Sequence, residues 1–113
     1  MKDITVYLAD DHTLLRKGMI RLLQSFDYIS RIEEAENGKK LIDLVEKNTP
    51  DVVLLDIRMP IMNGIEACGI LAKKFTDVKI LVFTMNDGPE MVDMLLKQGA
   101  HGFLSKGSNT DEL

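Results

Sequence analysis

The chain has a single cysteine, no tryptophan and no apolar run long enough to cross a bilayer. The lone cysteine, Cys68, rules out an internal disulfide and falls in an apolar helical pattern typical of a core residue. A membrane-spanning helix would need about 20 consecutive apolar residues. The first residues, MKDITVYLADDH, reach two aspartates before the apolar core of a signal peptide could form. We therefore expect a cytoplasmic protein with no membrane contact.

Clusters of basic residues are also missing. The net charge is −4, and the lysines and arginines are scattered along the 113 residues. Because a nucleic-acid-binding domain normally carries a basic face, we do not expect this segment to bind DNA itself. Neither GxxxxGK[ST] nor GxGxxG occurs in the sequence, which disfavours a nucleotide-binding module. The length fits one small domain, residues 1–113.

Strand-like and helix-like segments alternate along the chain. The segments expected as strands are Ile4–Ala9, Arg31–Glu36, Asp51–Asp56, Val78–Phe83 and Gly102–Ser105. The segments expected as helices are Thr13–Gln24, Lys39–Lys47, Ile65–Phe75 and Pro89–Gln98. Helices between consecutive strands imply parallel strands with right-handed crossovers. The pattern therefore predicts a doubly wound α/β fold, in which ligands bind beyond the carboxyl ends of the strands.

Polar side chains suited to one reaction stand at the ends of four of these strands. Asp10 and Asp11 follow the first strand, and Asp56 closes the third. Thr84 follows the fourth strand and Lys106 the fifth. Each of them alone is more simply explained as a turn, cap or solvated surface residue. Because the carboxyl ends of parallel strands meet at one edge of a sheet, their joint placement favours a single site.

Three carboxylates at one edge require positive charge close by. Two carboxylates about 4 Å apart repel by roughly 4 kcal/mol at an effective dielectric constant near 20. A divalent cation together with the Lys106 ammonium group balances the charges of Asp10, Asp11 and Asp56. Carboxylate and carbonyl oxygens favour Mg²⁺, with Mn²⁺ as a substitute. We interpret His12 as a helix-start residue rather than a ligand.

The same residues fit phosphoryl transfer onto an aspartate. A carboxylate can act as the nucleophile and form an acyl phosphate, and such transfer depends mainly on positioning and on neutralising the phosphoryl oxygens. We expect Asp56 to be the acceptor, with the cation, Lys106 and the Thr84 hydroxyl each binding one oxygen. Asn63 and Gly64, in the turn after Asp56, can help backbone N–H groups approach the site.

The chain resembles the response-regulator receiver domains of two-component signalling. The segments that carry the resemblance are ADDH at 9–12, LLDIRMPIMNG at 54–64, LVFTM at 81–85 and GAHGFLSKG at 99–107. It covers nearly the whole chain, and ADDHTLLRKGM and NGIEA look most like the NarL/FixJ subgroup. The resemblance implies a flavodoxin-like, five-stranded parallel sheet of order 2-1-3-4-5. It also implies a switch domain, not an enzyme, that assists only its own phosphorylation and dephosphorylation.

The resemblance further implies a role for each residue of the metal and acceptor site. Asp56 would accept a phosphoryl group from a phosphohistidine of a sensor histidine kinase. Asp11, Asp56 and the backbone carbonyl of Arg58 would ligate Mg²⁺, and Asp10 would act largely through water.

Near the end of the chain, Thr84 and Phe103 look like the paired switch residues, and Lys106 would hold the phosphoryl group. Gly107 departs from the family pattern, because receivers often have proline after the site lysine with a cis peptide bond. A non-proline cis bond costs about 3 kcal/mol, so we expect a looser or trans Lys106–Gly107 bond.

The segment that follows, GSNTDEL, predicts the start of a last helix with Asn109 as its N-cap, truncated at the end of the sequence. An uncovered sheet face would favour association into a homodimer. Members of the resembling subgroup usually carry a C-terminal helix-turn-helix, so DNA binding is expected only through an output domain outside this chain.

A haloacid-dehalogenase-like aspartyl phosphatase is the alternative function, since such enzymes also use an aspartyl nucleophile, Mg²⁺, a threonine and a lysine. They carry a second aspartate two positions after the nucleophile. Arg58 stands there in this chain, and no cap domain is present. The sequence therefore favours the switch over the enzyme.

Overall fold

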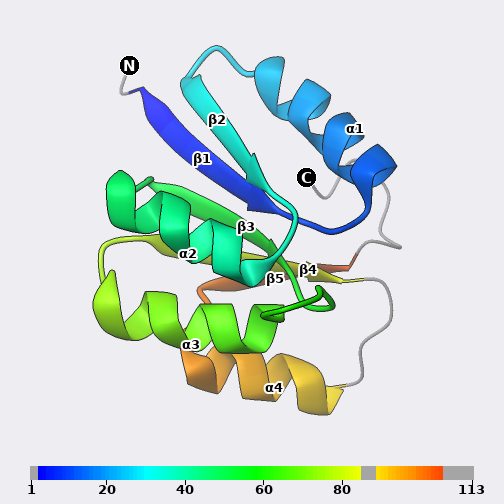
Figure 1. Ribbon diagram of the computed structural model, residues 1–113, viewed down its shortest axis with the longest axis vertical. Coiled ribbons are helices and arrows are strands. Elements are labelled where there is room, and N and C mark those ends of the chain that lie inside the picture. The colour runs from blue at the N-terminus through cyan, green and yellow to red at the C-terminus, as the bar shows by residue number, and fades with distance from the viewer. Residues whose placement is uncertain (1–2, 85–88, 106–113) are drawn as a thin grey trace.

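The computed structural model describes residues 3–84 and 89–105 and forms one parallel sheet flanked by helices (Figure 1). The strands are β1 (Ile4–Ala9), β2 (Ile29–Ala35), β3 (Val52–Asp56), β4 (Lys79–Thr84) and β5 (Gly102–Ser105). The helices are α1 (Thr13–Gln24), α2 (Gly38–Lys47), α3 (Gly64–Lys74) and α4 (Pro89–Gln98). The sheet order is β2-β1-β3-β4-β5, which confirms the predicted doubly wound topology.

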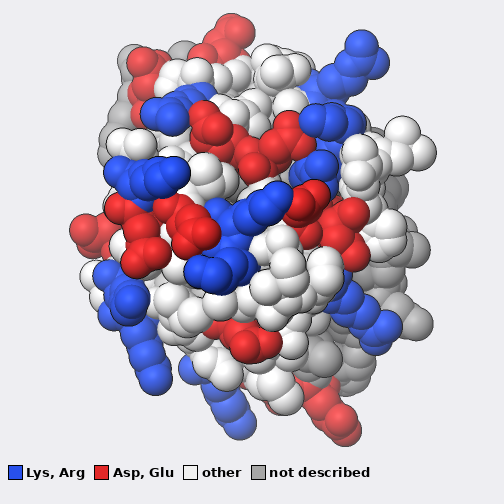
Figure 2. All heavy atoms as spheres, viewed as in Figure 1, with Lys and Arg blue, Asp and Glu red and all other residues white. Residues whose placement is uncertain are grey.

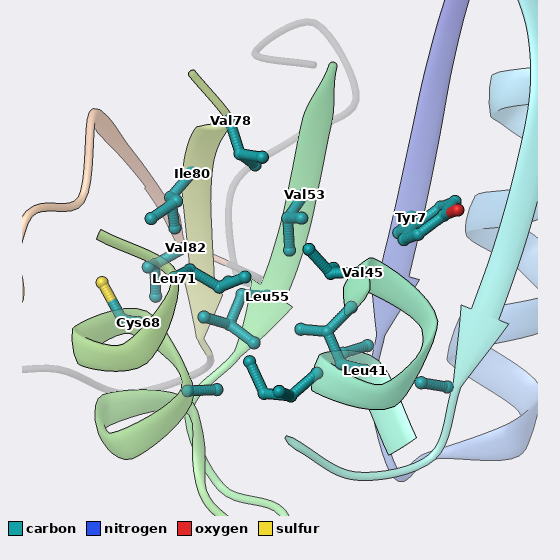
Figure 3. Close-up of a cluster of buried hydrophobic side chains, with 14 of the residues drawn as sticks. Tyr7, Leu41, Val45, Val53, Leu55, Cys68, Leu71, Val78, Ile80 and Val82 are labelled. Carbon is teal, nitrogen blue, oxygen red and sulfur yellow. The ribbon is translucent and has the colours of Figure 1, made fainter. Parts of the chain in front are cut away.

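The main core lies between the sheet and the helices α2, α3 and α4. Figure 3 shows the part of it that α2 and α3 contribute. Strand β3 reads VVLLD, and the side chains on both of its faces are largely buried, which leaves no place for a polar alternation. From the helices, Leu41, Val45 and Leu71 point into this layer and are fully buried. Burying one such side chain contributes about 1.5–3 kcal/mol relative to leaving it exposed. This layer therefore fixes the positions of β1, β3 and β4 relative to one another.

The opposite sheet face packs against α1 (Figure 1). Val6, Leu8 and Leu54 of the sheet are buried there, with Met19 and Leu23 of α1 partly buried against them. No residue of α1 is fully buried. An apolar pocket of ≈ 260 Å³ lies between α1 and the strands β1, β3 and β4. The expected last helix, with its N-cap at Asn109, falls outside the described residues.

Several element boundaries differ from the sequence prediction, most of them by one residue. Strand β2 begins at Ile29 rather than Arg31 because Ser30 is the extra residue of a bulge: Ile4 pairs with Ile29, and Thr5 pairs with Arg31. The bulge interrupts the apolar–polar alternation from which the boundary was predicted. Helix α2 begins at Gly38 because the Asn37 side chain accepts a hydrogen bond from the Lys40 N–H and caps the helix. As predicted, β2 is an edge strand.

Charged groups of both signs are mixed on the surface. Figure 2 shows basic and acidic side chains side by side over the visible face, without a broad basic area. Some of them form ion pairs, such as Lys39 with Asp43 along α2 at 3.6 Å. Within residues 3–84 and 89–105, no helix has the length and apolarity that crossing a membrane requires.

Cys68 provides a test of the packing of α3 on the sheet. Its side chain is fully buried, and burial raises the pKa of the thiol. Because the thiolate is the reactive form and must be reached by the reagent, we expect DTNB to modify the native chain at least about 100-fold more slowly than the urea-unfolded chain. The absorbance time course measures both rates. Equal rates would mean that α3 does not hold Cys68 against the sheet.

Candidate functional site

Three carboxylates and one imidazole converge at the carboxyl edge of the sheet. β1 and β3 are paired neighbours, with Ala9 opposite Leu55. Asp10 directly follows β1 and Asp56 is the last residue of β3, so the two side chains emerge next to each other. The carboxylate oxygens of Asp10, Asp11 and Asp56 and a ring nitrogen of His12 all lie within 4.8 Å of one another. This group could hold a metal ion.

The three aspartates differ in their contact with water. Asp10 and Asp56 are 0% and 3% exposed, whereas about a third (35%) of the Asp11 side chain is accessible. The Asp10 Oδ1 atom accepts a hydrogen bond from the His12 N–H at 2.9 Å, and the Asp56 Oδ1 atom accepts one from the Ile57 N–H at 2.8 Å. Buried carboxylates are costly unless positive charge lies close by. The cluster is therefore suited to bind a cation, with Asp11 on the solvent side.

His12 occupies the N-cap position of α1, as a helix-start residue does, and its side chain makes no cap hydrogen bond. Its Nδ1 atom lies 3.5 Å from Asp10 Oδ1 and 3.4 Å from Asp11 Oδ1. The imidazole thus belongs to the polar cluster as well. The sequence analysis had interpreted His12 only as a helix-start residue. The ADDH spacing was the available signal, but a cap position alone does not determine which way the ring turns.

The β3–α3 loop forms the rim of the site. An open pocket of ≈ 580 Å³ is bordered by Asp11 on one side and by residues of this loop, including Arg58 and Asn63, on the other. The Asn63 side chain accepts a hydrogen bond from the Glu66 N–H at 2.9 Å and so caps α3. Arg58 lies two residues beyond Asp56 and borders the same pocket as Asp11.

Gly64 allows this loop to close onto the end of β3. Its N–H donates to the Ile57 carbonyl at 2.7 Å. A Cβ atom at this position would lie 2.1 Å from the Asp56 carbonyl oxygen, so no other residue fits without a backbone shift. The Gly64 N–H is thus used within the loop. Its role is the close approach of the two backbones rather than the donation of an N–H group to a ligand.

Ile61, at the tip of the same loop, has a left-handed backbone with φ 69° and is 80% exposed. This conformation costs a β-branched residue about 1–2 kcal/mol, and the exposed side chain gains little from burial. We expect Ile61→Gly to raise the free energy of unfolding by about 1 kcal/mol, after the entropy cost of glycine. Urea unfolding measures the change. Ile61→Ala is the matched control and should gain less, whereas a destabilised Ile61→Gly chain would contradict the assignment of strain.

The remaining predicted residues lie on β4, on β5 and beyond. Thr84 is the last residue of β4, which pairs with β3, but its side chain is outside the described part of the chain. Lys106 and Gly107 also lie outside the described residues. Phe103 is on β5, is half-buried, and packs against the main core. The backbone thus brings Thr84 to the same sheet edge as Asp56.

Arg16 contacts the backbone of Asp10 from behind the site, and Glu34 holds Arg16 in place, a relation that sequence analysis missed. The Arg16 guanidinium donates to the Asp10 carbonyl at 2.7 Å and to Glu34 Oε1 at 2.7 Å. The hydrogen bond from Arg16, with a weaker contribution from Lys17, lowers the pKa of Glu34. The residues stand 18 positions apart, so no local spacing connects them before the sheet is formed.

Comparison with known proteins agrees with this fold. The model of the response regulator receiver domain family matches residues 6–113. Among curated proteins, the chain is 40% identical over 110 residues to the transcriptional regulatory protein DegU of Brevibacillus brevis. It is 39% identical over 109 residues to the nitrate/nitrite response regulator NarL of Escherichia coli K12. These alignments cover 97% and 96% of this chain but 47% and 50% of those proteins, so the chain spans about half their length.

Solved structures give the same result. The signal receiver domain of the putative response regulator NarL from Mycobacterium tuberculosis superposes with a TM-score of 0.91 at 34% identity, covering 99% of this chain and 90% of that one. A LuxR-family two-component response regulator from Aurantimonas gives a TM-score of 0.92 at 30% identity, with 98% and 79% covered.

Proposed function

The chain belongs to the response regulator receiver domain family, and we propose that it accepts a phosphoryl group on Asp56 in a Mg²⁺-dependent reaction. Receiver domains of this family are signalling switches, and the similarity to NarL and DegU supports a place in phosphorelay signalling. The observation that carries the proposal is the convergence of Asp10, Asp11 and Asp56 within 4.8 Å at the carboxyl edge of the sheet.

In the proposed site, Asp56 is the nucleophile. The Ile57 N–H holds its Oδ1 atom at 2.8 Å and so fixes the plane of the carboxylate. When bound, Mg²⁺ would supply charge neutralisation for the phosphoryl oxygens. The residues that would hold it are Asp11, Asp56 and the Arg58 backbone carbonyl, with Asp10 acting largely through water. The pocket of ≈ 580 Å³ beside Asp11 leaves room for a phosphodonor to approach.

The phosphoryl group on Asp56 would be held by the Thr84 hydroxyl and the Lys106 ammonium group. It adds nearly two negative charges and three acceptor oxygens, and it can shift a two-state equilibrium only by contacting the two states differently. Thr84 ends the strand next to Asp56, and Phe103 is half-buried against the core. We propose these two residues as the switch pair, with the aromatic ring turning inward as the hydroxyl moves toward the phosphoryl group.

The wider role follows from the relatives. The phosphodonor would be a phosphohistidine on a sensor histidine kinase, in the cytoplasm. Since the chain spans about half the length of NarL and DegU, we propose that residues 1–113 are the receiver part of a transcriptional regulator. DNA binding would then reside in an output domain outside this sequence, with dimerisation of the regulator as a further expectation.

Incubation with acetyl phosphate and Mg²⁺ tests the proposal. A switch domain gains one phosphoryl group per chain, which intact-mass spectrometry detects and which hydroxylamine removes, as expected for an acyl phosphate. Omission of Mg²⁺ should prevent the gain. A phosphatase would instead turn over many equivalents of small phosphate esters. Catalytic release of phosphate without a labelled chain would contradict the switch.

A further inference from the structure

Arg16, on the first turns of α1, reaches back to the end of β1. Its NH1 atom donates to the Asp10 backbone carbonyl at 2.7 Å, and its Nε atom donates to Glu34 on β2 at 2.7 Å. Only 11% of the Arg16 side chain is exposed. A surface ion pair between α1 and β2 would not require the contact with Asp10 and would not be buried in this way.

The contact completes the fixation of Asp10. The Asp10 N–H donates to the Ala35 carbonyl at 3.1 Å, which is the last backbone bond between β1 and β2 at this edge. The Asp10 carboxylate accepts from the His12 N–H. Because β2 ends at Ala35, a backbone N–H further along β2 does not reach the Asp10 carbonyl. The Arg16 guanidinium donates to that carbonyl instead.

A hydrogen bond that holds the Asp10 carbonyl also orients the backbone N–H of Asp11. The Asp10 carbonyl oxygen and the Asp11 N–H belong to one planar peptide unit, so an anchored oxygen sets the orientation of the Asp11 backbone. Asp11 is the partly exposed carboxylate of the cluster, and its orientation decides whether it can meet an ion held by Asp56.

We propose that Arg16, held by Glu34, is a positioning residue for the cation site: it orients the Asp10–Asp11 peptide so that the Asp11 carboxylate is preorganised for the ion. This inference rests on the proposed Mg²⁺-dependent function. Residues that orient ligands from behind commonly alter metal affinity by 10–100-fold when changed.

If charge were the only contribution of Arg16, replacing it would change the Mg²⁺ affinity in the direction opposite to a loss of positioning. The Arg16 guanidinium is a positive charge bonded to the backbone of Asp10, so its removal should strengthen cation binding if charge were its only effect. Loss of positioning should weaken binding. Lysine keeps the charge but cannot reproduce the fork that bonds Asp10 and Glu34 together. The direction of the change in Arg16→Gln and the failure of Arg16→Lys therefore distinguish the two roles.

Mg²⁺ binding to the 113-residue chain, followed by titration calorimetry because the chain has no tryptophan, tests the proposal. We expect Arg16→Lys and Arg16→Gln each to weaken Mg²⁺ binding by about 10-fold. Labelling by acetyl phosphate should recover at saturating Mg²⁺. Lys17→Gln is the matched control, because the hydrogen bonds of Lys17 within residues 3–84 and 89–105 go to Glu34, the nearer at 3.0 Å, and not to the Asp10 carbonyl. It should leave the affinity within about twofold of wild type.

Urea unfolding of each variant separates loss of the site from loss of the fold. An Arg16→Lys chain that remains folded and binds Mg²⁺ as tightly as wild type overturns the positioning role, as does an Arg16→Gln chain that binds more tightly. A wild-type chain that neither binds Mg²⁺ nor labels overturns the proposed function itself. The two failures are therefore distinguishable.

Discussion

Asp56→Asn is expected to abolish phosphorylation of the chain. The amide keeps the size of the side chain and an oxygen that can accept from the Ile57 N–H, but it removes the nucleophilic carboxylate. Removing a nucleophile costs several orders of magnitude in rate, so labelling by acetyl phosphate with Mg²⁺ should fall on the order of 10³-fold or more. Intact-mass spectrometry over time measures the labelled fraction.

The matched control is Asp43→Asn on α2. Its carboxylate is 52% exposed and pairs with Lys39 at 3.6 Å, away from the acidic cluster. This variant should label at the wild-type rate, because it removes the same charge without touching the site. If Asp56→Asn were labelled as rapidly as wild type, the acceptor would be another residue and the assignment would be wrong.

Asp11→Asn is expected to weaken Mg²⁺ binding by about 100-fold, which corresponds to about 2.7 kcal/mol. Removing one of three clustered carboxylates takes away a direct electrostatic partner of the ion. The Asp11 side chain is partly exposed, so the substitution should leave the fold intact. Titration calorimetry gives the affinity, and the rate of labelling by acetyl phosphate should shift to higher Mg²⁺ concentration in parallel.

Asp27→Asn is the control for this second prediction, since Asp27 is exposed in the connection between α1 and β2. It lowers the net negative charge by the same amount and should bind Mg²⁺ within about twofold of wild type, because exposed and distant charges are screened. An Asp11→Asn chain with wild-type affinity would remove Asp11 from the proposed ligand set.

The sheet topology and the acidic cluster could both be predicted from the sequence. Apolar strand segments alternate with helical ones, and parallel strands bring their carboxyl ends to one edge. Asp10 and Asp56 therefore had to meet if β1 and β3 were neighbours, and the pairing of Ala9 with Leu55 makes them so. The order of the strands, however, came from the family resemblance, since the alternation alone fits several orders.

Contacts between distant segments were beyond sequence reasoning. The bulge at Ser30 moved the start of β2, because register depends on the pairing of two strands rather than on either one. The left-handed conformation of Ile61 contradicts the usual preference of that residue, so local propensity could not reveal it. The hydrogen bonds of Arg16 depend on side-chain packing between α1 and β2, which only the folded chain defines.

Peptide mapping of the phosphorylated residue tests the whole account. The chain is incubated with acetyl phosphate and Mg²⁺, and the acyl phosphate is reduced with borohydride, which converts the modified aspartate to homoserine. We predict homoserine at position 56, and none there when Mg²⁺ is omitted. Homoserine at another aspartate, or equal modification of Asp56 without a divalent cation, would contradict the proposal that this acidic cluster is a metal-dependent phosphoacceptor site.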